Sequence, residues 1–390
     1  MRVVVIGGGA IGAAVALFLR RIGGSAVEVQ VVETDPTLAR SSSALSAGSV
    51  RQQFSNAINV QMSRFGHEVI SQAQHWLAVD DQPVHVGWVD GAYLFCATES
   101  GAPVLRHNQA VQAAAGAEVA LLSPDEAARQ MPWLRTDDLA LTALGQGREG
   151  WLDGEAFARA LGATARSLGA VWRRARVVGF DRQGDRLTAA RLDNGEAIAA
   201  DAFVNAAGPW AGALGALAGL PVPVHARRRT VFAMRCPTPL PLTPLVVDPA
   251  GVWFRSEGSG FIGGWSPGEG DDDPDDLPLD QPDLAQFEDR LWPALAHRVP
   301  AFEALRVQHA WAGYYEVHPL DHNALIGPHP ACANFWLCNG FSGHGLQHAP
   351  AAGRGLAEHL LTGAWQTLDL SPFSPQRVLA GQPFVEQAII

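Results

Sequence analysis

Residues 3–12 read V-V-V-I-G-G-G-A-I-G, and this stretch predicts how the chain begins to fold. The apolar, β-branched run at 2–6 lacks alternation, which is typical of a buried parallel strand. Small and apolar residues at 13–21 predict a helix that packs closely and is ended by Gly23 and Gly24. The run 27–32 predicts a second strand. Together these segments form a β-α-β unit of about 30 residues.

Three glycines of this turn have the spacing G-x-G-x-x-G. Gly7 permits the tight turn, Gly9 lets the backbone approach a pyrophosphate, and Gly12 lets the helix lie on the strand. The helix N-terminus then faces the phosphates. Glu33 ends the second strand, where a carboxylate accepts hydrogen bonds from ribose hydroxyls and repels a 2′-phosphate. The pattern predicts FAD or NAD rather than NADP, and it disfavours a turn without a ligand.

The composition sets the class of protein. The chain has 390 residues, of which 47% are hydrophobic, so it can bury a large core and suggests two domains or one large mixed fold. Its 28 basic and 39 acidic residues give a net charge of −11, which argues against nucleic acid as the main partner. The sequence has no lysine, so no step can use a lysine Schiff base.

The cysteines, Cys96, Cys236, Cys332 and Cys338, form no C-x-x-C pair and show no zinc spacing with histidines. They are typical of reduced core residues in a cytoplasmic protein, with one disulfide as the alternative. We predict no metal site, because the acidic stretch 268–276 lacks the EF-hand order and is better interpreted as a solvated loop than as a calcium site. Glycines interrupt the apolar N-terminal run, and we predict no membrane span.

The remaining pattern predicts a mixture of helices and strands. Helices are expected at 56–77, 153–168, 286–299 and 346–361, and a further helix follows a capping box at Ser123. Strands are expected at 84–97, 170–180, 186–192, 197–204 and 335–338, and strands and turns between 221 and 265.

Two segments have the chemistry that a flavin requires. The run 40–51, R-S-S-S-A-L-S-A-G-S-V-R, offers small hydroxyl residues that can wrap a pyrophosphate and ribityl chain, although such a run is also typical of a flexible loop. Residues 342–345, S-G-H-G, precede a helix whose N-terminus can stabilise the negative charge of a reduced flavin. An ordinary glycine-rich helix start is the alternative for this segment.

Five blocks carry a resemblance to a known family. They are 3–12, S-S-S-A-L-S-A-G-S-V-R-Q-Q-F at 41–54, V-N-A-A-G-P-W-A at 204–211, W-A-G-Y-Y-E-V-H-P-L-D-H-N-A-L-I-G at 311–327, and N-G-F-S-G-H-G-L-Q at 339–347. With them the chain resembles the D-amino-acid oxidase, glycine oxidase and sarcosine oxidase family of FAD-dependent oxidoreductases from residue 3 to about 360. The R-Q-Q-F and P-L-D-H-N motifs most resemble those of the sarcosine and dimethylglycine dehydrogenase branch of the family.

The resemblance implies an α/β fold (mixed α+β), with a Rossmann-type FAD-binding domain and a mixed-sheet substrate domain. We predict a discontinuous FAD-binding domain at 1–80, 145–218 and 306–375. The substrate domain is predicted at 81–144 and 219–305, and a C-terminal tail at 376–390.

The resemblance also implies noncovalent FAD. The cysteine to which some family members attach FAD has no counterpart near 311–320, and the attachment histidine of others has none at 50–53. The residues that fall on the family's FAD contacts are Gly7, Gly9, Ala10, Ile11, Gly12, Glu33, Ser42, Ser43, Ser46, Ala47, Gly48, Ser49, Arg51, Val177, Ala207, Gly208, Trp210, Gly343, His344, Gly345, Leu346 and Gln347. Val177 matches the position at which the backbone meets adenine.

The sequence departs from the family at the substrate's carboxylate. Tyr315 stands in place of the arginine that amino-acid oxidases use, and Gln347 stands in place of a sarcosine oxidase lysine. Arg51 and Arg255 are the candidate cations that could compensate. Because a buried carboxylate without a cation is costly, we expect small α-amino acids to be poor substrates unless Arg255 replaces the missing arginine.

The candidate catalytic residues are Arg51, Tyr314, Tyr315, His318, Gln347 and Arg255. Tyrosine hydroxyls can orient an amine or carboxylate, although aromatic core is the alternative, and an imidazole can exchange protons near neutral pH.

We predict oxidation of a C–N bond in a secondary or N-methylated amine or an amino acid, followed by hydrolysis of the imine. The expected partners are this small molecule and, as the electron acceptor, oxygen or an electron carrier. Two alternatives stay open: a non-catalytic or assembly-type flavoprotein, and an NAD-dependent dehydrogenase.

Overall fold

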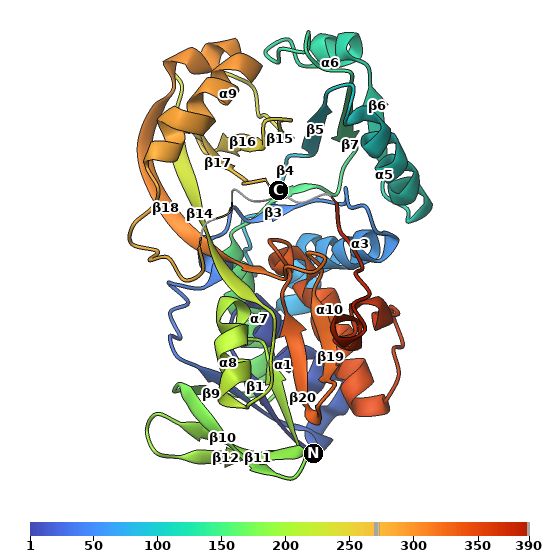
Figure 1. The fold of residues 1–390 in the computed structure, drawn as a ribbon, viewed down its shortest axis with the longest axis vertical. Helices are drawn as coiled ribbons and strands as arrows, with labels where there is room; N and C mark the ends of the chain where they lie inside the picture. Colours follow the sequence, from blue (N-terminus) through green and yellow to red (C-terminus); the bar gives the residue numbers. More distant parts are fainter. Residues whose placement is uncertain (269–271, 273, 388–390) are drawn as a thin grey trace.

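The structure is a computed structural model that describes residues 1–268, 272 and 274–387. Two large sheets occupy opposite ends of its long axis (Figure 1), with the N-terminus at the lower end of the view. A six-stranded sheet forms the lower part and an eight-stranded sheet forms the upper part. The predicted mixed α/β fold is confirmed.

The six-stranded sheet has the order β19-β20-β13-β1-β2-β9. Its strands are β1 (Arg2–Ile6), β2 (Glu28–Glu33), β9 (Val171–Arg174), β13 (Ala202–Asn205), β19 (Leu325–His329) and β20 (Cys332–Asn339). All neighbouring pairs are parallel except β19 with β20. The central strand β1 therefore pairs with β13, about 200 residues later, and β13 pairs with β20, which lies later still.

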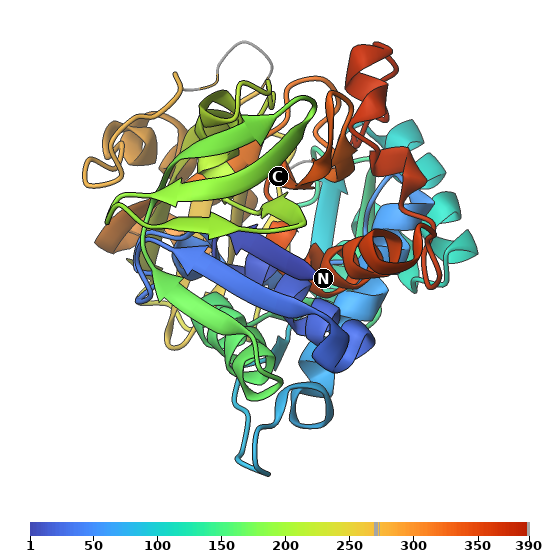
Figure 2. The ribbon, with the colours of Figure 1, turned by 90° about the horizontal axis from the view of Figure 1, so that it is seen from below.

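Helices bury one face of this sheet. They are α1 (Ala10–Gly23), α7 (Gly154–Ser167) and α10 (Gly345–Thr362). Helix α3 (Ala57–Ser71) packs against α10, and α4 (Ala73–Leu77) packs against α7. Small residues let α10 lie close to α1: a Cβ on Gly353 would meet the backbone of Ala14. The other face carries α8 (Ala211–Leu217) and a small sheet of β10 (Val177–Gln183), β11 (Arg186–Leu192) and β12 (Ala197–Ala199), which crosses the view in Figure 2.

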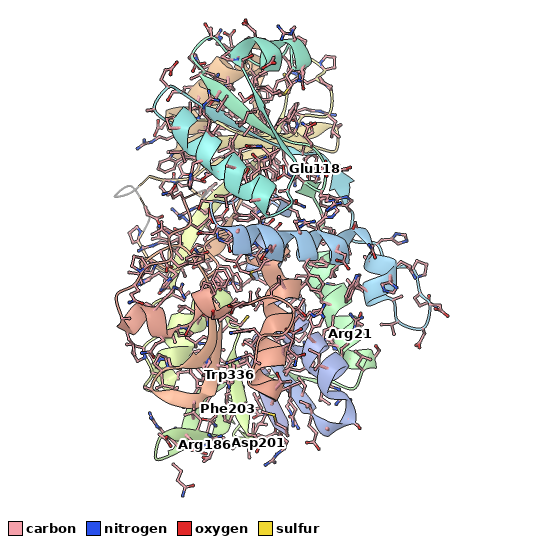
Figure 3. All side chains as sticks on the ribbon, turned by 90° about the vertical axis from the view of Figure 1, so that its right-hand side faces the viewer. Arg21, Glu118, Arg186, Asp201, Phe203 and Trp336 are labelled. Carbon is pink, nitrogen blue, oxygen red and sulfur yellow. The ribbon has the colours of Figure 1, made fainter. Side chains whose placement is uncertain are left out.

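Figure 3 shows how the core and the rim of this region differ. Phe203 on β13 is fully buried, and Trp336 follows on the neighbouring strand β20. Below them, Arg186 donates to the main-chain oxygen of Asp201, whose carboxylate accepts from the Arg2 N–H. Polar contacts thus close the end of the sheet, while aromatic side chains fill its centre.

The eight-stranded sheet has the order β18-β14-β17-β16-β15-β5-β7-β6. Its strands are β5 (Tyr93–Ala97), β6 (Val119–Leu122), β7 (Leu141–Gly145), β14 (His225–Arg235), β15 (Leu245–Val247), β16 (Val252–Glu257), β17 (Gly260–Trp265) and β18 (Arg306–Val317). The pairs are antiparallel except β5 with β15, so the sheet is mixed. The helices α5 (Ala102–Ala114), α6 (Pro124–Gln130) and α9 (Trp292–Arg298) belong to this half.

Short elements join the halves. They are α2 (Ser42–Leu45), which contacts α7 and β18, and a small sheet of β3 (Ser49–Val50), β8 (Gly150–Trp151) and β4 (Val89–Asp90). Helix α11 (Gln376–Leu379) belongs to the C-terminal segment. The division into domains stays a proposal. One boundary would move, because β18 pairs with β14 along its length although 306–317 was assigned to the FAD-binding domain.

Several predicted elements need correction. The strand at 170–180 is two strands, β9 and β10, because the first half pairs with β2 and the second with β11. The helix at 56–77 breaks at Gln72, whose backbone leaves the helical region. Helix α1 begins at Ala10, directly after the turn, three residues earlier than predicted. Only 89–90 and 93–97 of the predicted strand 84–97 pair, and the first turns at 287–291 of the predicted helix 286–299 are π-helical.

The C-terminal tail is held against the body of the protein. Arg377 forms an ion pair with the buried Asp321 (2.7 Å). The buried carboxylate of Glu386 accepts hydrogen bonds from the main chain and hydroxyl of Ser55 and from Asn59. Residues 388–390 of the predicted tail lie outside the described residues.

All four cysteines are free thiols. Within the described part of the chain, the search for a helix both long and apolar enough to cross a membrane found none.

Candidate functional site

A cavity of about 560 Å³ runs from the glycine turn after β1 to the facing side of the eight-stranded sheet. Strands β1 and β2, the loop before β10 and the turn after β13 line one half. Strands β14, β16, β17 and β18 line the other. The predicted site residues on its wall are Gly7, Gly9, Ala10, Ile11, Glu33, Ser42, Ser43, Ser46, Ala47, Val177, Ala207, Gly208, Trp210, Tyr314, Tyr315, Gly343, Gly345 and Leu346.

The glycine turn has the close contacts that the motif requires. Gly7 has φ +103°, and a Cβ there would collide with the carbonyl of Ala206. A Cβ on Gly12 would collide with the Gly7 carbonyl, so this glycine packs the helix on the strand rather than lining the cavity. Gly9 faces open space, where a Cβ would meet only the Ser43 hydroxyl at 3.5 Å. A phosphate can therefore approach the backbone at Gly9.

Glu33 closes this end of the cavity. Its carboxylate oxygens accept hydrogen bonds from the N–H groups of Gly8 (2.7 Å) and Asp35 (2.8 Å). These bonds fix the carboxylate at the end of β2 while part of it still lines the cavity. A charged acceptor held in this way is suited to a ribose diol.

The serine-rich loop is ordered by its own hydroxyls. Ser41 caps α2, Ser43 accepts from the Ala10 N–H (3.1 Å), and Ser42 donates to the Tyr314 carbonyl (2.7 Å). The loop thus ties the start of α1 to β18. Gly48 follows at φ +65° and packs on the Leu152 carbonyl, and Ser49 of β3 pairs with Trp151 of β8. Neither residue lines the cavity, and both support its wall from behind.

Aromatic side chains form the half of the cavity next to the eight-stranded sheet. Trp253, Trp265, Tyr314, Tyr315 and Trp210 line it. The Tyr314 hydroxyl donates to the Leu277 carbonyl (2.6 Å), and its ring meets Trp210 edge to face. Burial raises the pKa of Tyr315, so its phenol stays neutral and can donate a hydrogen bond.

The N-terminus of α10 meets Tyr315. Gly343 has φ +100°, and a Cβ there would lie 2.5 Å from the Tyr315 ring, so only glycine lets the ring and the turn touch. Glu316, the next residue on β18, also lines the cavity and accepts from the Gly340 N–H (3.1 Å). Burial raises the pKa of Glu316 to about 7. The helix start therefore has a carboxyl group beside it that can be neutral.

Two predicted residues lie behind the wall. Arg51 is buried, with its guanidinium over the Phe54 ring (4.2 Å) and donating to the Gln53 carbonyl. Burial lowers the pKa of Arg51. The side chain of Gln347 accepts from the Arg51 N–H (2.7 Å) and from the Ser63 hydroxyl (3.1 Å). Neither residue lines the cavity; Gln347 holds the main chain at Arg51, and the Arg51 side chain packs on Phe54 behind the wall.

Arg255 also misses the substrate side of the cavity. Its guanidinium donates to the Ala47 carbonyl (2.6 Å), pairs with Glu257 and lies over the Trp151 ring (4.6 Å). It shares a face of β16 with Trp253, two residues earlier, but it extends beneath the serine-rich loop. The structure thus places Arg255 as a support of this loop.

The predicted histidines are buried away from the cavity. The ring of His318 is fully buried and its Nδ1 lies 2.8 Å from Asp321. His344 packs between Phe54 and His348, and burial lowers its pKa to about 3, so it stays neutral. Neither imidazole reaches a group bound in the cavity, and the predicted substrate-side position of His318 is not the one observed.

Sequence reasoning missed several wall residues. They are Thr34, Asp35, Arg40, Arg176, Arg229, Thr230, Trp253, Trp265 and Glu316. Arg229, Trp253 and Trp265 lie on three strands of one sheet, so their meeting depends on long-range pairing. The consecutive arginines at 227–229 of β14 show no alternation in sequence or burial, so no local pattern singles out Arg229.

The cavity combines a glycine turn open to phosphate, a carboxylate for a ribose, and a helix start beside an aromatic chamber. These features define the class of dinucleotide-binding oxidoreductases, whose cofactor can be FAD or NAD. The family model described as "FAD dependent oxidoreductase" (DAO) matches residues 2–359, and the chain belongs to this family. This match decides between FAD and NAD in favour of FAD.

The relatives agree with this assignment. The chain is 38% identical to FAD-dependent oxidoreductase domain-containing protein 1 of Bos taurus, over all of this chain and 87% of that protein. It is 27% identical to mitochondrial sarcosine dehydrogenase of Homo sapiens, over 93% of this chain and 40% of that protein. The fold is similar to that of L-proline dehydrogenase from P. horikoshii, with a TM-score of 0.84, 24% identity and 98% of each chain covered.

Proposed function

We propose that the protein oxidises the C–N bond of a secondary or N-methylated amine or amino acid. The observation that carries the proposal is the continuity of the cavity, which joins the dinucleotide half to an aromatic chamber at the start of α10. A substrate in this chamber would lie between Tyr315 and the walls formed by Trp253 and Trp265.

We further propose that the dinucleotide half holds FAD. The turn at Gly7 and Gly9 would meet the pyrophosphate, Glu33 a ribose, and Val177 the adenine. The start of α10 at Gly343–Gly345 would meet the flavin. Bound FAD supplies the hydride acceptor for a C–H bond next to nitrogen, and the resulting imine is hydrolysed.

The chain's own residues orient the substrate and exclude water. The neutral Tyr315 phenol can donate to an anionic or carbonyl group of the substrate, or accept from its N–H. The indoles of Trp253 and Trp265 remove water from the chamber, which strengthens such polar contacts. The names of sarcosine dehydrogenase and L-proline dehydrogenase support this proposal, because both specify an amino acid with a secondary amine.

The test is anaerobic reduction of the protein-bound flavin by a panel of amines. The measurement is the loss of the absorbance of oxidised flavin. The panel contains secondary amines with and without a carboxylate, primary amino acids, and alcohols of matched shape as controls. We expect at least one secondary amine to bleach the flavin and the alcohols to leave it oxidised. Dithionite serves as the positive control for flavin reduction. If it reduces the flavin and no amine does, the proposal is contradicted.

A non-catalytic flavoprotein is the second candidate. It is favoured by the absence of the family's carboxylate arginine and lysine at Tyr315 and Gln347, and by the ion pair that already engages Arg229 with Asp272 (2.7 Å). This candidate predicts bound FAD that none of the amines reduces.

A further inference from the structure

Arg229 is a cation on the wall of the aromatic chamber. It lies in the middle of β14, opposite Gly313 of β18, and its side chain is 15% exposed. Its guanidinium lies 5.4 Å from the centre of the Tyr315 ring. Tyr315 and Gly313 are two residues apart on β18, so Arg229 and Tyr315 are diagonal neighbours on one face of the sheet. The neighbouring strand thus supplies a positive charge beside the tyrosine.

The present partner of Arg229 shows which ligand it fits. Both terminal nitrogens of Arg229 contact the Asp272 carboxylate, Nη1 to Oδ1 at 2.7 Å and Nη2 to Oδ2 at 3.2 Å. This two-pronged geometry is the one in which arginine binds carboxylates most specifically. A substrate carboxylate can adopt the same geometry, with the aromatic walls around the rest of the molecule.

Asp272 can leave without losing all of its partners. Its side chain is 30% exposed, so water can solvate the carboxylate when it separates from Arg229. Its Oδ2 also lies 3.6 Å from Arg227 Nε, and Arg227 pairs with Asp275 as well. An arriving carboxylate would therefore exchange with Asp272 at Arg229, while Arg227 retains the displaced aspartate.

We propose that Arg229 is the carboxylate-binding residue of the chamber and that Asp272 occupies it until a carboxylate-bearing ligand arrives. The inference rests on the proposed function and narrows it, because it selects N-substituted amino acids over neutral amines. It also replaces Arg255 as the cation that compensates for Tyr315. The chamber then binds small amino acids, in contrast to the expectation from the sequence alone.

The test measures binding rather than turnover. Benzoate and its neutral analogue benzamide, which have no oxidisable C–H bond next to an amine nitrogen, are titrated into the FAD-loaded protein by isothermal calorimetry. We expect benzoate to bind and benzamide to bind at least tenfold more weakly. Arg229→Gln should weaken benzoate binding about 30-fold or more. The control is Arg235→Gln, which removes the same charge from an exposed position on the same strand and should change the affinity less than twofold.

Asp272→Asn is expected to bind benzoate more tightly, and a misfolded variant cannot produce this result. Removing the competing carboxylate should tighten benzoate binding about twofold to fivefold, as expected for a partly exposed ion pair. Unchanged benzoate affinity in Arg229→Gln would overturn the assignment of Arg229, and unchanged or weaker affinity in Asp272→Asn would overturn the role of Asp272. Failure of every amine to reduce the flavin would contradict the proposed oxidation while leaving this binding result intact.

Discussion

The two halves of the cavity are built in different ways. The dinucleotide half uses backbone groups and small residues, and its key positions Gly7, Gly9, Gly12 and Glu33 lie within one β-α-β unit. The aromatic half uses large side chains such as Arg229, Trp253 and Tyr315 from strands that are distant in the sequence. The first half therefore tolerates almost no change of backbone geometry, whereas the second can change its ligand by single side-chain substitutions.

The largest effect should come from breaking the dinucleotide half at Gly12. A Cβ in Gly12→Ala would collide with the Gly7 carbonyl, which cannot move because Gly7 itself is packed on Ala206. We expect the purified variant to lose its FAD, measured as the ratio of flavin to protein absorbance. Gly268→Ala, where a Cβ meets no atom of the described residues within 4 Å, is the control. Full FAD content in Gly12→Ala would show that the turn does not depend on this close contact.

The attachment of FAD tests the same half without a mutation. Because the family's attachment residues are missing from 50–53 and 311–320, we predict that contacts of the wall alone hold the cofactor. Acid precipitation should then release all of the yellow colour into the supernatant. Colour that remains in the protein pellet would demonstrate a covalent bond.

Glu316 lies where the two halves meet, and it should make stability depend on pH. Its folded-state pKa is raised to about 7 from an ordinary value of 4.5, so the folded protein holds a proton that the unfolded chain releases. Below about pH 4.5 the carboxyl is protonated in both states, and Glu316 leaves the free energy of unfolding unchanged. Between about pH 4.5 and 7 it lowers the free energy of unfolding increasingly, and above about pH 7 this decrease levels off.

We expect the free energy of unfolding to fall by about 1–3 kcal/mol less between low and high pH in Glu316→Gln than in the wild type. The measurement is urea unfolding of wild type and variant at pH 5 and pH 8. Glu149, whose pKa burial also raises to about 7, provides a second source of the decline, so the variant should keep part of it. Parallel pH curves for the two proteins would contradict the prediction.

The smallest effect is expected behind the aromatic half, at Arg51. Its charge acts on the cavity indirectly: burial raises the pKa of the neighbouring Tyr315 phenol, and the cations Arg229 and Arg51 oppose that rise. Loss of the cation in Arg51→Met, which keeps packing on Phe54, should lower the flavin midpoint potential by about 30 mV, equivalent to about 1.4 kcal/mol for a two-electron couple. An unchanged potential at full FAD content would reject an electrostatic role for Arg51.

The same contrast explains what the sequence could predict. The positions of Gly7, Gly9 and Glu33 follow from a local motif, because a strand, a turn and a helix fix them within one unit. Arg255 shows the limit for the other half. Arg255 and Trp253 share a face of β16, but the run 252–256 is buried throughout, so alternation cannot tell which of its residues reaches the cavity.

Long-range pairing decides the remainder. Arg229 meets Tyr315 only because β14 pairs with β18 in a particular register, with Arg229 opposite Gly313. His318 follows β18 by one residue, yet its ring turns into the core toward Asp321 rather than toward the cavity. A sequence pattern gives the candidates on such strands, whereas the register decides which of them face the ligand.

The order of strands in the six-stranded sheet has a consequence for synthesis on the ribosome. Strand β1 can pair with β2 early, but its other edge stays open until β13 at 202–205 has emerged, and β13 in turn waits for β20 at 332–339. At a synthesis rate of about 5–20 residues per second, the apolar edge of β1 is unpaired for roughly 10–40 seconds. Slow elongation before residue 205 should therefore favour aggregation of the nascent chain over folding.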